Sequence, residues 1–196
     1  MNKTLFWFSL IVTLAFNITK AQDPYSMIKP KKESHGTNTI IRIGIIGLST
    51  FCDSEFENRY LQFWKNANED IKPEIIDTVC CSPYSSGLFI YKSKNAYDYL
   101  IFWVTENEYN SDIHIFYLVN NILNNIGPFP IQKDCETCDD QIYPVNKIKI
   151  YGKDNEIIIK LLNPFIYNIG QDNWQKFSPE KTYFTIDKKG GKLIKH

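Results

Sequence analysis

Histidine is scarce in this sequence of 196 residues, and its scarcity removes the usual hydrolytic arrangements. His35 lies in a segment that contains proline and several lysines, His196 is the last residue, and only His114 falls inside the folded part that we predict. The sequence has neither a Gly-X-Ser-X-Gly nor a His-Glu-X-X-His motif, which would carry a nucleophilic serine or a catalytic zinc ion. A triad or a Cys-His pair would therefore have to use His114. We favour a protein without catalytic residues and without a cofactor.

A long apolar run is absent as well. The N-terminal run from Leu5 to Phe16 has 12 residues, whereas a transmembrane helix needs about 20. The cationic start, this short run and the small-residue end at Thr19 and Ala21 form the three-part pattern of a secretory signal peptide. We therefore predict a signal peptide over residues 1–21 and export to the periplasm or the extracellular space. After cleavage we expect no insertion into a membrane.

Charge of one sign does not predominate. The chain has 22 basic and 22 acidic side chains, and removal of residues 1–21 takes away Lys3 and Lys20, which leaves a net charge of −2. Nucleic-acid binding would require a basic stripe on a structural element. The one basic cluster, formed by Lys29, Lys31 and Lys32, lies beside a proline and is typical of a solvated linker. The sequence therefore predicts no nucleic-acid partner.

The mature chain is predicted to form one domain behind a flexible segment. Residues 22–38 contain two prolines, one glycine and no hydrophobic period, so we expect an exposed tether there. Residues 39–196 have the length and the aromatic content for one sizeable core. The predicted organisation is a signal peptide, a tether and a single domain.

Most of the domain has strand patterns. β-Branched and aromatic residues predict strands over residues 40–48, 74–80, 87–92 and 97–105, the last as a central strand, and we expect the second and third of these to pair. Two hairpins follow, because GKDN separates KIKIY from EIIIKLL and KKGG separates KTYFTID from KLIKH. An antiparallel sheet is therefore the expected frame.

Two segments have apolar residues at helical spacing. Residues 54–68 place Phe56, Tyr60, Phe63, Trp64 and Ala67 on one face and offer Asp53 or Ser54 as the cap. Residues 111–126 place Ile115, Val119, Ile122 and Ile126 on one face, and Gly127 and Pro128 would end the helix. The predicted fold class is α+β, a mainly antiparallel β-sheet with about two covering helices.

Five cysteines follow the predicted cleavage point. An exported protein meets an oxidising environment, so we expect disulfide bonds among them and one thiol left over. A bridge from Cys52 to one of the neighbouring pair is one option, and the connectivity stays open. The candidate disulfide residues are Cys52, Cys80, Cys81, Cys135 and Cys138.

The pair Cys135 and Cys138 allows three interpretations. A thiol oxidoreductase needs a stabilised thiolate, but Asp134, Glu136 and Asp139 would repel one. A zinc site would need two further ligands, which Cys80 and Cys81 could supply, although the spacing is not that of a zinc ribbon. The acidic residues also lack the order of a calcium-binding EF-hand loop. We favour a disulfide-stapled acidic loop and predict no metal site.

The remaining candidates for chemistry are carboxylates and aromatic rings. Glu106, Glu108 and Asp112 lie close together in sequence and leave a carboxylate-based enzyme as an alternative. We expect the aromatic residues to be core rather than to line a sugar- or peptide-binding face; the candidates are Tyr84, Trp103, Trp174 and Tyr183. We therefore predict an exported, non-catalytic binding or envelope-associated module with an unknown protein or small ligand as its partner. The alternatives are a thiol-disulfide or carboxylate-based enzyme and a zinc-stabilised binding module.

Overall fold

The protein is an all-β structure. A computed structural model describes residues 23–35, 38–53, 58–69, 72–80, 85–106, 111–133, 145, 147–168, 173–189 and 191–196. These residues form seventeen strands, all paired antiparallel, and no α-helix. The prediction of an α+β fold with two covering helices is therefore wrong, although its antiparallel frame is confirmed. The predicted signal peptide lies outside the described residues.

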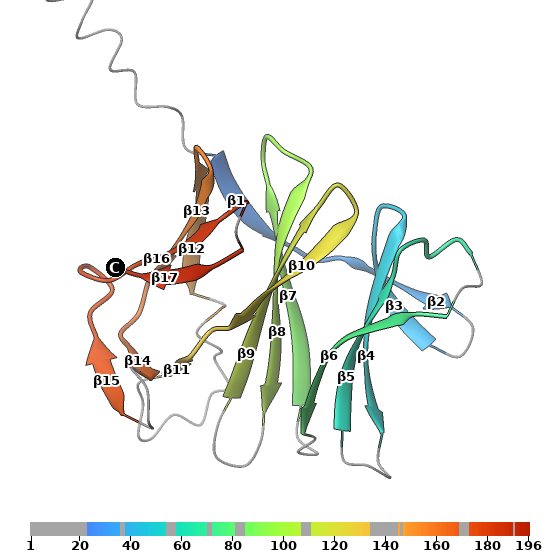
Figure 1. The fold of residues 1–196 in the computed structure, drawn as a ribbon, viewed down its shortest axis with the longest axis horizontal. Helices are drawn as coiled ribbons and strands as arrows, with labels where there is room; N and C mark the ends of the chain where they lie inside the picture. Colours follow the sequence, from blue (N-terminus) through green and yellow to red (C-terminus); the bar gives the residue numbers. More distant parts are fainter. Residues whose placement is uncertain are drawn as a thin grey trace, which may run out of the picture.

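The largest sheet has nine strands and curls into a nearly closed barrel (Figure 1). Its two ends approach each other, because a Cβ atom at Gly191, just before the last strand, would lie 3.4 Å from Cδ1 of Ile126 in the first. In sheet order the strands are β10 (Ile122–Pro128), β9 (Ser111–Val119), β8 (Asp98–Glu106), β7 (Ser85–Ser93), β1 (Asp23–Ile28), β12 (Ile148–Lys153), β13 (Glu156–Leu161), β16 (Phe184–Asp187) and β17 (Leu193–Lys195).

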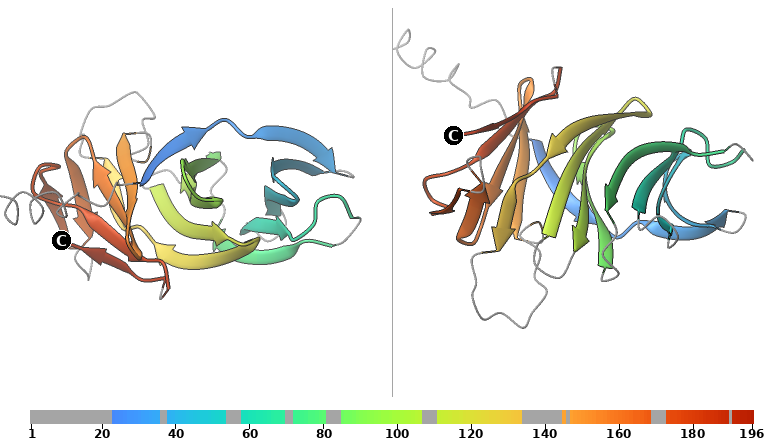
Figure 2. Two further views of the ribbon diagram at one scale, coloured as in Figure 1. Left: turned by 90° about the horizontal axis from the view of Figure 1, so that it is seen from above. Right: turned by 60° about the horizontal axis from the view of Figure 1, so that its bottom comes forward.

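Two smaller sheets complete the fold. The five-stranded sheet consists of β2 (Lys31–His35), β3 (Asn38–Ile43), β4 (Ile46–Asp53), β5 (Asn58–Trp64) and β6 (Glu74–Cys80), in that order. The three-stranded sheet consists of β11 (Ile131–Lys133), β14 (Phe165–Asn168) and β15 (Trp174–Phe177). Figure 2 shows β1 running on into β2, so that one chain segment joins the two larger sheets.

That joining segment is part of the region that the sequence predicts as a tether. Residues 23–28 form β1, which pairs with both β7 and β12 in the middle of the nine-stranded sheet. Residues 31–35 form β2, which pairs with β3. The structure therefore differs from the prediction here: the segment carries little hydrophobic pattern because it contributes backbone hydrogen bonds more than side chains, with Tyr25 as its buried anchor.

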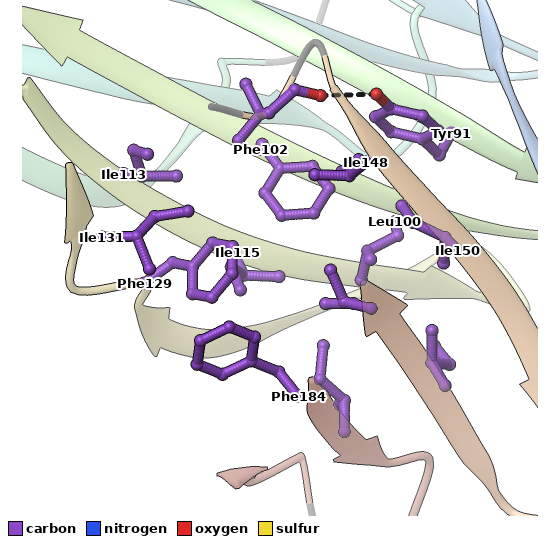
Figure 3. Close-up of a cluster of buried hydrophobic side chains, with 14 of the residues drawn as sticks. Tyr91, Leu100, Phe102, Ile113, Ile115, Phe129, Ile131, Ile148, Ile150 and Phe184 are labelled. Carbon is purple, nitrogen blue, oxygen red and sulfur yellow. Dashed lines mark hydrogen bonds between the residues drawn. The ribbon is translucent and has the colours of Figure 1, made fainter. Parts of the chain in front are cut away.

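The inside of the barrel is filled by alternate residues of its strands, which we call the barrel core (Figure 3). Leu100, Phe102 and Val104 of β8 point into it, as do Ile113, Ile115 and Tyr117 of β9. The rings of Phe129 and Phe184 meet edge to face with centroids 4.8 Å apart. The hydroxyl of Tyr91 donates a hydrogen bond of 2.5 Å to the Val145 carbonyl. Burial of this phenol raises the pKa of Tyr91 to about 12.

The other face of the same strands packs against the five-stranded sheet, in what we call the sandwich core. Ile101 and Trp103 of β8 and Phe116 and Leu118 of β9 meet Ile43, Ile46, Leu48, Leu61 and Phe63 from the smaller sheet. β8 is therefore covered on both faces, which is why its sequence is continuously apolar rather than alternating. The predicted central strand at 97–105 is confirmed.

The first predicted helix, 54–68, is a strand and a turn. β5 occupies residues 58–64, and its apolar residues are divided between the two faces of the sheet. Leu61 and Phe63 enter the sandwich core, while Trp64 packs with Ala67 and Ile40 in a separate buried cluster. The helical spacing is therefore accidental, because the apolar residues of this segment belong to two different clusters on opposite faces of the strand.

The second predicted helix, 111–126, is the β9–β10 hairpin. Asn120 and Asn121 have φ angles of 51° and 61°, the left-handed pair required by a tight type I′ turn. Asparagine tolerates this conformation better than other non-glycine residues. Alternation along β9 then places odd-numbered residues in the barrel core and even-numbered ones toward the sandwich core.

The other strand predictions are mostly confirmed. The segment 40–48 contains a hairpin rather than one strand, because Gly44 turns the chain with a φ of 61° between β3 and β4. Strands β6 and β7 exist where expected but do not pair with each other; β6 pairs with β5, and β7 with β1 and β8. Both C-terminal hairpins are confirmed as β12–β13 and β16–β17. Within the described residues no helix has the length and hydropathy for a membrane crossing.

Candidate functional site

A carboxylate, Asp98, is buried at the start of β8 and is 3% exposed. Its Oδ2 atom accepts hydrogen bonds from the hydroxyls of Tyr25 at 2.8 Å and Tyr117 at 2.7 Å. The ammonium group of Lys188, which follows β16, lies 3.8 Å from the same oxygen. Residues from β1, β8, β9 and the β16–β17 turn thus converge on one charge inside the barrel.

The surroundings of Asp98 keep both phenols protonated. Burial, and then the charge of Asp98, raise the pKa of Tyr25 far above its usual value, and burial with the hydrogen bond to Asp98 raises the pKa of Tyr117. Both tyrosines are therefore fixed donors rather than bases. Among the described residues Oδ1 of Asp98 has no hydrogen-bond partner. We interpret the group as a polar clamp across three strands of the barrel.

A second ionisable pair joins the two larger sheets. Nδ1 of His114 on β9 lies 2.7 Å from Oδ2 of Asp77 on β6, and the side chains are 20% and 18% exposed. Trp103 on β8 lies opposite His114, and the centroids of the two rings are 5.8 Å apart. Among the described residues, the buried Nε1 of Trp103 has no hydrogen-bond partner. A carboxylate on Nδ1 orients the imidazole and leaves Nε2 for a substrate proton, so this pair has the geometry of a general base.

Of this pair, the sequence indicated His114 but not Asp77. It isolated His114 as the histidine within the fold, but Asp77 lies 37 residues away and on a different sheet. No spacing rule connects them, because the contact depends on how the five-stranded sheet packs over β9. The one available signal was an acidic residue in an otherwise apolar strand, EIIDTVC.

The third candidate lies on the outside of the barrel, where lysines gather on β12 and β13. Lys149 pairs directly with Lys160 in the strand register, and both side chains are exposed. Lys147, two residues before Lys149 and also exposed, lies just ahead of β12. We call Lys147, Lys149 and Lys160 the lysine face. Among the described residues no carboxylate forms an ion pair with any of the three.

The same two strands show the normal arrangement four residues further along. There Lys153 pairs with Glu156, so opposite charges face each other. Directly opposed charges of opposite sign stabilise an antiparallel pair, and like charges destabilise it. The Lys149–Lys160 pair is therefore a local energetic conflict in this hairpin, as is the opposition of Glu156 and Asp187 between β13 and β16, and such conflicts are expected at functional positions.

Aromatic side chains border the lysine face on its β16–β17 side. Nζ of Lys160 lies 5.7 Å from the centroid of the Tyr183 ring. The Tyr183 and His196 rings are stacked, with centroids 4.7 Å apart and an interplanar angle of 9°. Nε2 of His196 lies 2.9 Å from Oγ1 of Thr185. Polar hydrogen-bonding atoms therefore continue the surface beyond the lysines.

The cysteine predictions fall mainly outside the described residues. Cys81, Cys135 and Cys138 are not among them, and of Cys80 only the backbone at the end of β6 is described. Cys52 is exposed on β4. Because β5 lies between β4 and β6, the Cα atoms of Cys52 and Cys80 are about 10 Å apart, further than a disulfide spans. The acidic loop with its two thiols stays a prediction.

The other predicted positions give a mixed picture. Trp103 is fully buried, as expected for core, whereas Tyr183 lies on the outer surface beside the lysines. Asp112 is exposed, and the side chains of Glu106, Glu108, Tyr84 and Trp174 lie outside the described residues. In the part of the chain that is described, no three His, Cys, Asp or Glu side chains are grouped as a metal ion requires.

Comparison with protein families, curated proteins and solved structures finds no match to this chain.

Proposed function

We propose that this protein is an exported, non-catalytic binding module whose binding surface includes the lysine face. The observation that carries the proposal is the direct opposition of Lys149 and Lys160 without an ion-paired carboxylate among the described residues. The Cβ atoms of directly opposed residues lie about 5 Å apart, and two like charges on such a pair destabilise it in the free protein. An anionic partner turns this repulsion into attraction, so the arrangement is better suited to the bound state than to the free one.

The buried ionisable groups support a binding role more than a catalytic one. Asp98 holds two tyrosine hydroxyls inside the barrel, where its surroundings are side chains of the core. Its position serves the packing of β1, β8 and β9. Among the described residues, Lys147, Lys149 and Lys160 on the outer sheet face are exposed and have no ion-paired carboxylate.

Export is the second part of the proposal and rests on the pattern of residues 1–21. A cationic start, a short apolar run and a small-residue end support passage through a membrane followed by cleavage. Expression of the full chain with its own N-terminus in a host with a periplasm tests this. The proposal expects mature protein outside the cytoplasm with Gln22 as its first residue; retention of residues 1–21 in a cytoplasmic product contradicts it.

The binding role is tested by comparing two pairs of variants against a panel of charged and neutral soluble polymers. K149Q with K160Q removes the two directly opposed lysines of the lysine face, and H114Q with D77N removes the inter-sheet pair. We expect binding to be lost in the first pair and kept in the second. The opposite pattern would move the functional site to His114 and Asp77.

An acid-base enzyme is the second candidate, because His114 and Asp77 have the required geometry. It predicts turnover of some substrate with a pH dependence that H114Q abolishes. The thiol-dependent and zinc-stabilised alternatives depend on Cys135 and Cys138. Mass spectrometry of unreduced protein from its native compartment tests them: the favoured reading expects both residues in disulfides, and free thiols with bound zinc would support the zinc module.

A further inference from the structure

The balanced net charge of the chain conceals a separation of charge along it. Residues 147–196 contain ten lysines and five acidic residues, whereas residues 1–146 contain 12 basic and 17 acidic ones. The basic segment supplies β12, β13, β16 and β17, which are neighbours in one sheet. A nearly neutral protein therefore has a basic side, and it is here that the lysine face lies.

The lysines form a row that crosses several strands. Lys149 pairs with Lys160, and on the other side Tyr25 pairs with Ile150, which places Ser26 beside Lys149. Ser26 in turn pairs with Lys92 of β7. With strands about 4.8 Å apart, Lys160, Lys149 and Lys92 span about 14 Å across the sheet. A row of this length fits repeated anionic groups along a polymer better than a single small anion.

The next row along the strands is largely apolar and carries no charge. It runs Pro24, Tyr151, Ile158, Thr185 and Ile194, each paired with the next in register. Ile194 is 44% exposed. Pro24 is exposed and Tyr151 half-buried, whereas Ile158 and Thr185 are buried. The surface thus offers cations in one row and apolar and phenol groups in the adjacent one, which complement the anionic substituents and the apolar ring faces of a charged sugar chain.

The aromatic border does not offer a free stacking surface. β13 and β17 lie on opposite sides of β16, and from them Lys160 and His196 approach the two sides of the Tyr183 ring. Unspecific binding of single-stranded nucleic acid relies on open ring faces that stack with bases. Tyr183 instead presents its edge and hydroxyl, which suit hydrogen bonds to hydroxyls and anionic oxygens.

We propose that the row of Lys92, Lys149 and Lys160 binds an acidic polysaccharide, a chain of sugar rings with carboxylate or sulfate groups at intervals. The inference rests on the proposed binding function and names its ligand class. The ammonium groups contact the anionic substituents, and Ser26, which is exposed, and Tyr183, which is half-buried, supply hydroxyls for the sugar rings.

The test uses two polymer pairs with a common sugar backbone, in each of which one member is charged and the other neutral: dextran sulfate against dextran, and polygalacturonate against its methyl ester. Mature protein is titrated with each at low and at physiological salt. We expect binding to the charged member of at least one pair, no binding to the neutral members, and weaker binding as salt rises. Comparison between the pairs shows whether sulfate or carboxylate is preferred.

Variants then locate the site. K149Q with K160Q is expected to weaken binding at least about tenfold, because two charge-assisted contacts are lost. K153Q is the matched control: it removes an exposed lysine from the same hairpin, but one that faces Glu156, and binding should change less than about twofold. Thermal midpoints of all variants confirm that they are folded. Equal loss in K153Q and in the double variant would overturn the inference.

Further outcomes separate this inference from the proposed function. If a neutral polymer binds and the double variant abolishes that binding, the binding module stands and the acidic ligand is wrong. Tighter binding to single-stranded DNA or to vesicles of anionic phospholipid than to either charged polysaccharide also overturns the ligand class. Absence of binding to every probe overturns both proposals.

Discussion

Charged side chains on the two faces of the nine-stranded sheet differ in whether they have polar or charged partners. On the inner face, the carboxylate of Asp98 receives two phenol donors and has the Lys188 ammonium nearby. On the outer face, Lys149 stands against Lys160 with no such compensation among the described residues. An uncompensated charge costs several kcal/mol in the interior but only a fraction of that at the surface, where water screens it. The fold can therefore tolerate an unfavourable pair of like charges outside the barrel but not inside it.

The largest effect is expected at Asp98. D98A removes the acceptor of two buried hydroxyls, so we expect a loss of about 3 kcal/mol in the free energy of unfolding. Urea denaturation followed by tryptophan fluorescence measures it. D112A, a change of an exposed aspartate on β9, is the control and should stay within about 0.5 kcal/mol. Equal effects of the two changes would show that the inner carboxylate is no clamp.

The tyrosine donors should show an intermediate effect with a defined pH dependence. Y25F and Y117F are each expected to cost about 1 kcal/mol at neutral pH. Because their pKa values are raised in the folded state, the folded protein keeps protons that the unfolded chain loses above pH about 10, so stability falls as pH rises beyond that point. Unfolding curves at pH 8 and above 10 measure this, and the double variant should lose stability less steeply. An unchanged slope would contradict the raised pKa values.

The pair between the sheets should contribute less, because both of its side chains are partly solvated. H114Q and D77N are each expected to destabilise by about 1 kcal/mol, and a double-mutant cycle should give a coupling of similar size. A coupling near zero would mean that the two larger sheets are held together by the sandwich core alone.

The smallest effect has the opposite sign. K160Q relieves the repulsion with Lys149 and should stabilise the protein by a few tenths of a kcal/mol, whereas K153Q removes an attraction to Glu156 and should destabilise it by a similar amount. Thermal midpoints at low salt measure both shifts, and added salt should reduce them. If K160Q destabilises as K153Q does, Lys160 is not repelled by Lys149, and the contrast with the Lys153–Glu156 pair fails.

Local sequence patterns predicted many strands but not their partners. The segments EIIDTVC and GLFIYK are strands as expected, yet the chain leaves one sheet and enters another between them. Turn chemistry was decisive where a short loop closed a hairpin, as between β12 and β13, where Asp154 adopts a φ of 53°. Where the connection links two sheets, the local sequence contains no information about pairing.

The two wrong helices have a common physical cause. In β5 and β9 both faces of the strand are buried, so apolar residues occur at nearly every spacing and a helical period can be found among them. Within the second segment, the adjacent Asn120 and Asn121 suit a turn with positive φ better than a helix. Burial on both faces removes the alternation that identifies a strand.

The β-rich antiparallel frame and the C-terminal hairpins follow from local sequence patterns, because they depend on residues close together in the chain. Tertiary structure alone decided that Asp77 meets His114, that Asp98 receives Tyr25 and Tyr117, and that lysines 11 residues apart stand side by side. Such contacts depend on sheet order and register, which arise from the packing of two cores at once. The functional proposals rest on these contacts for that reason.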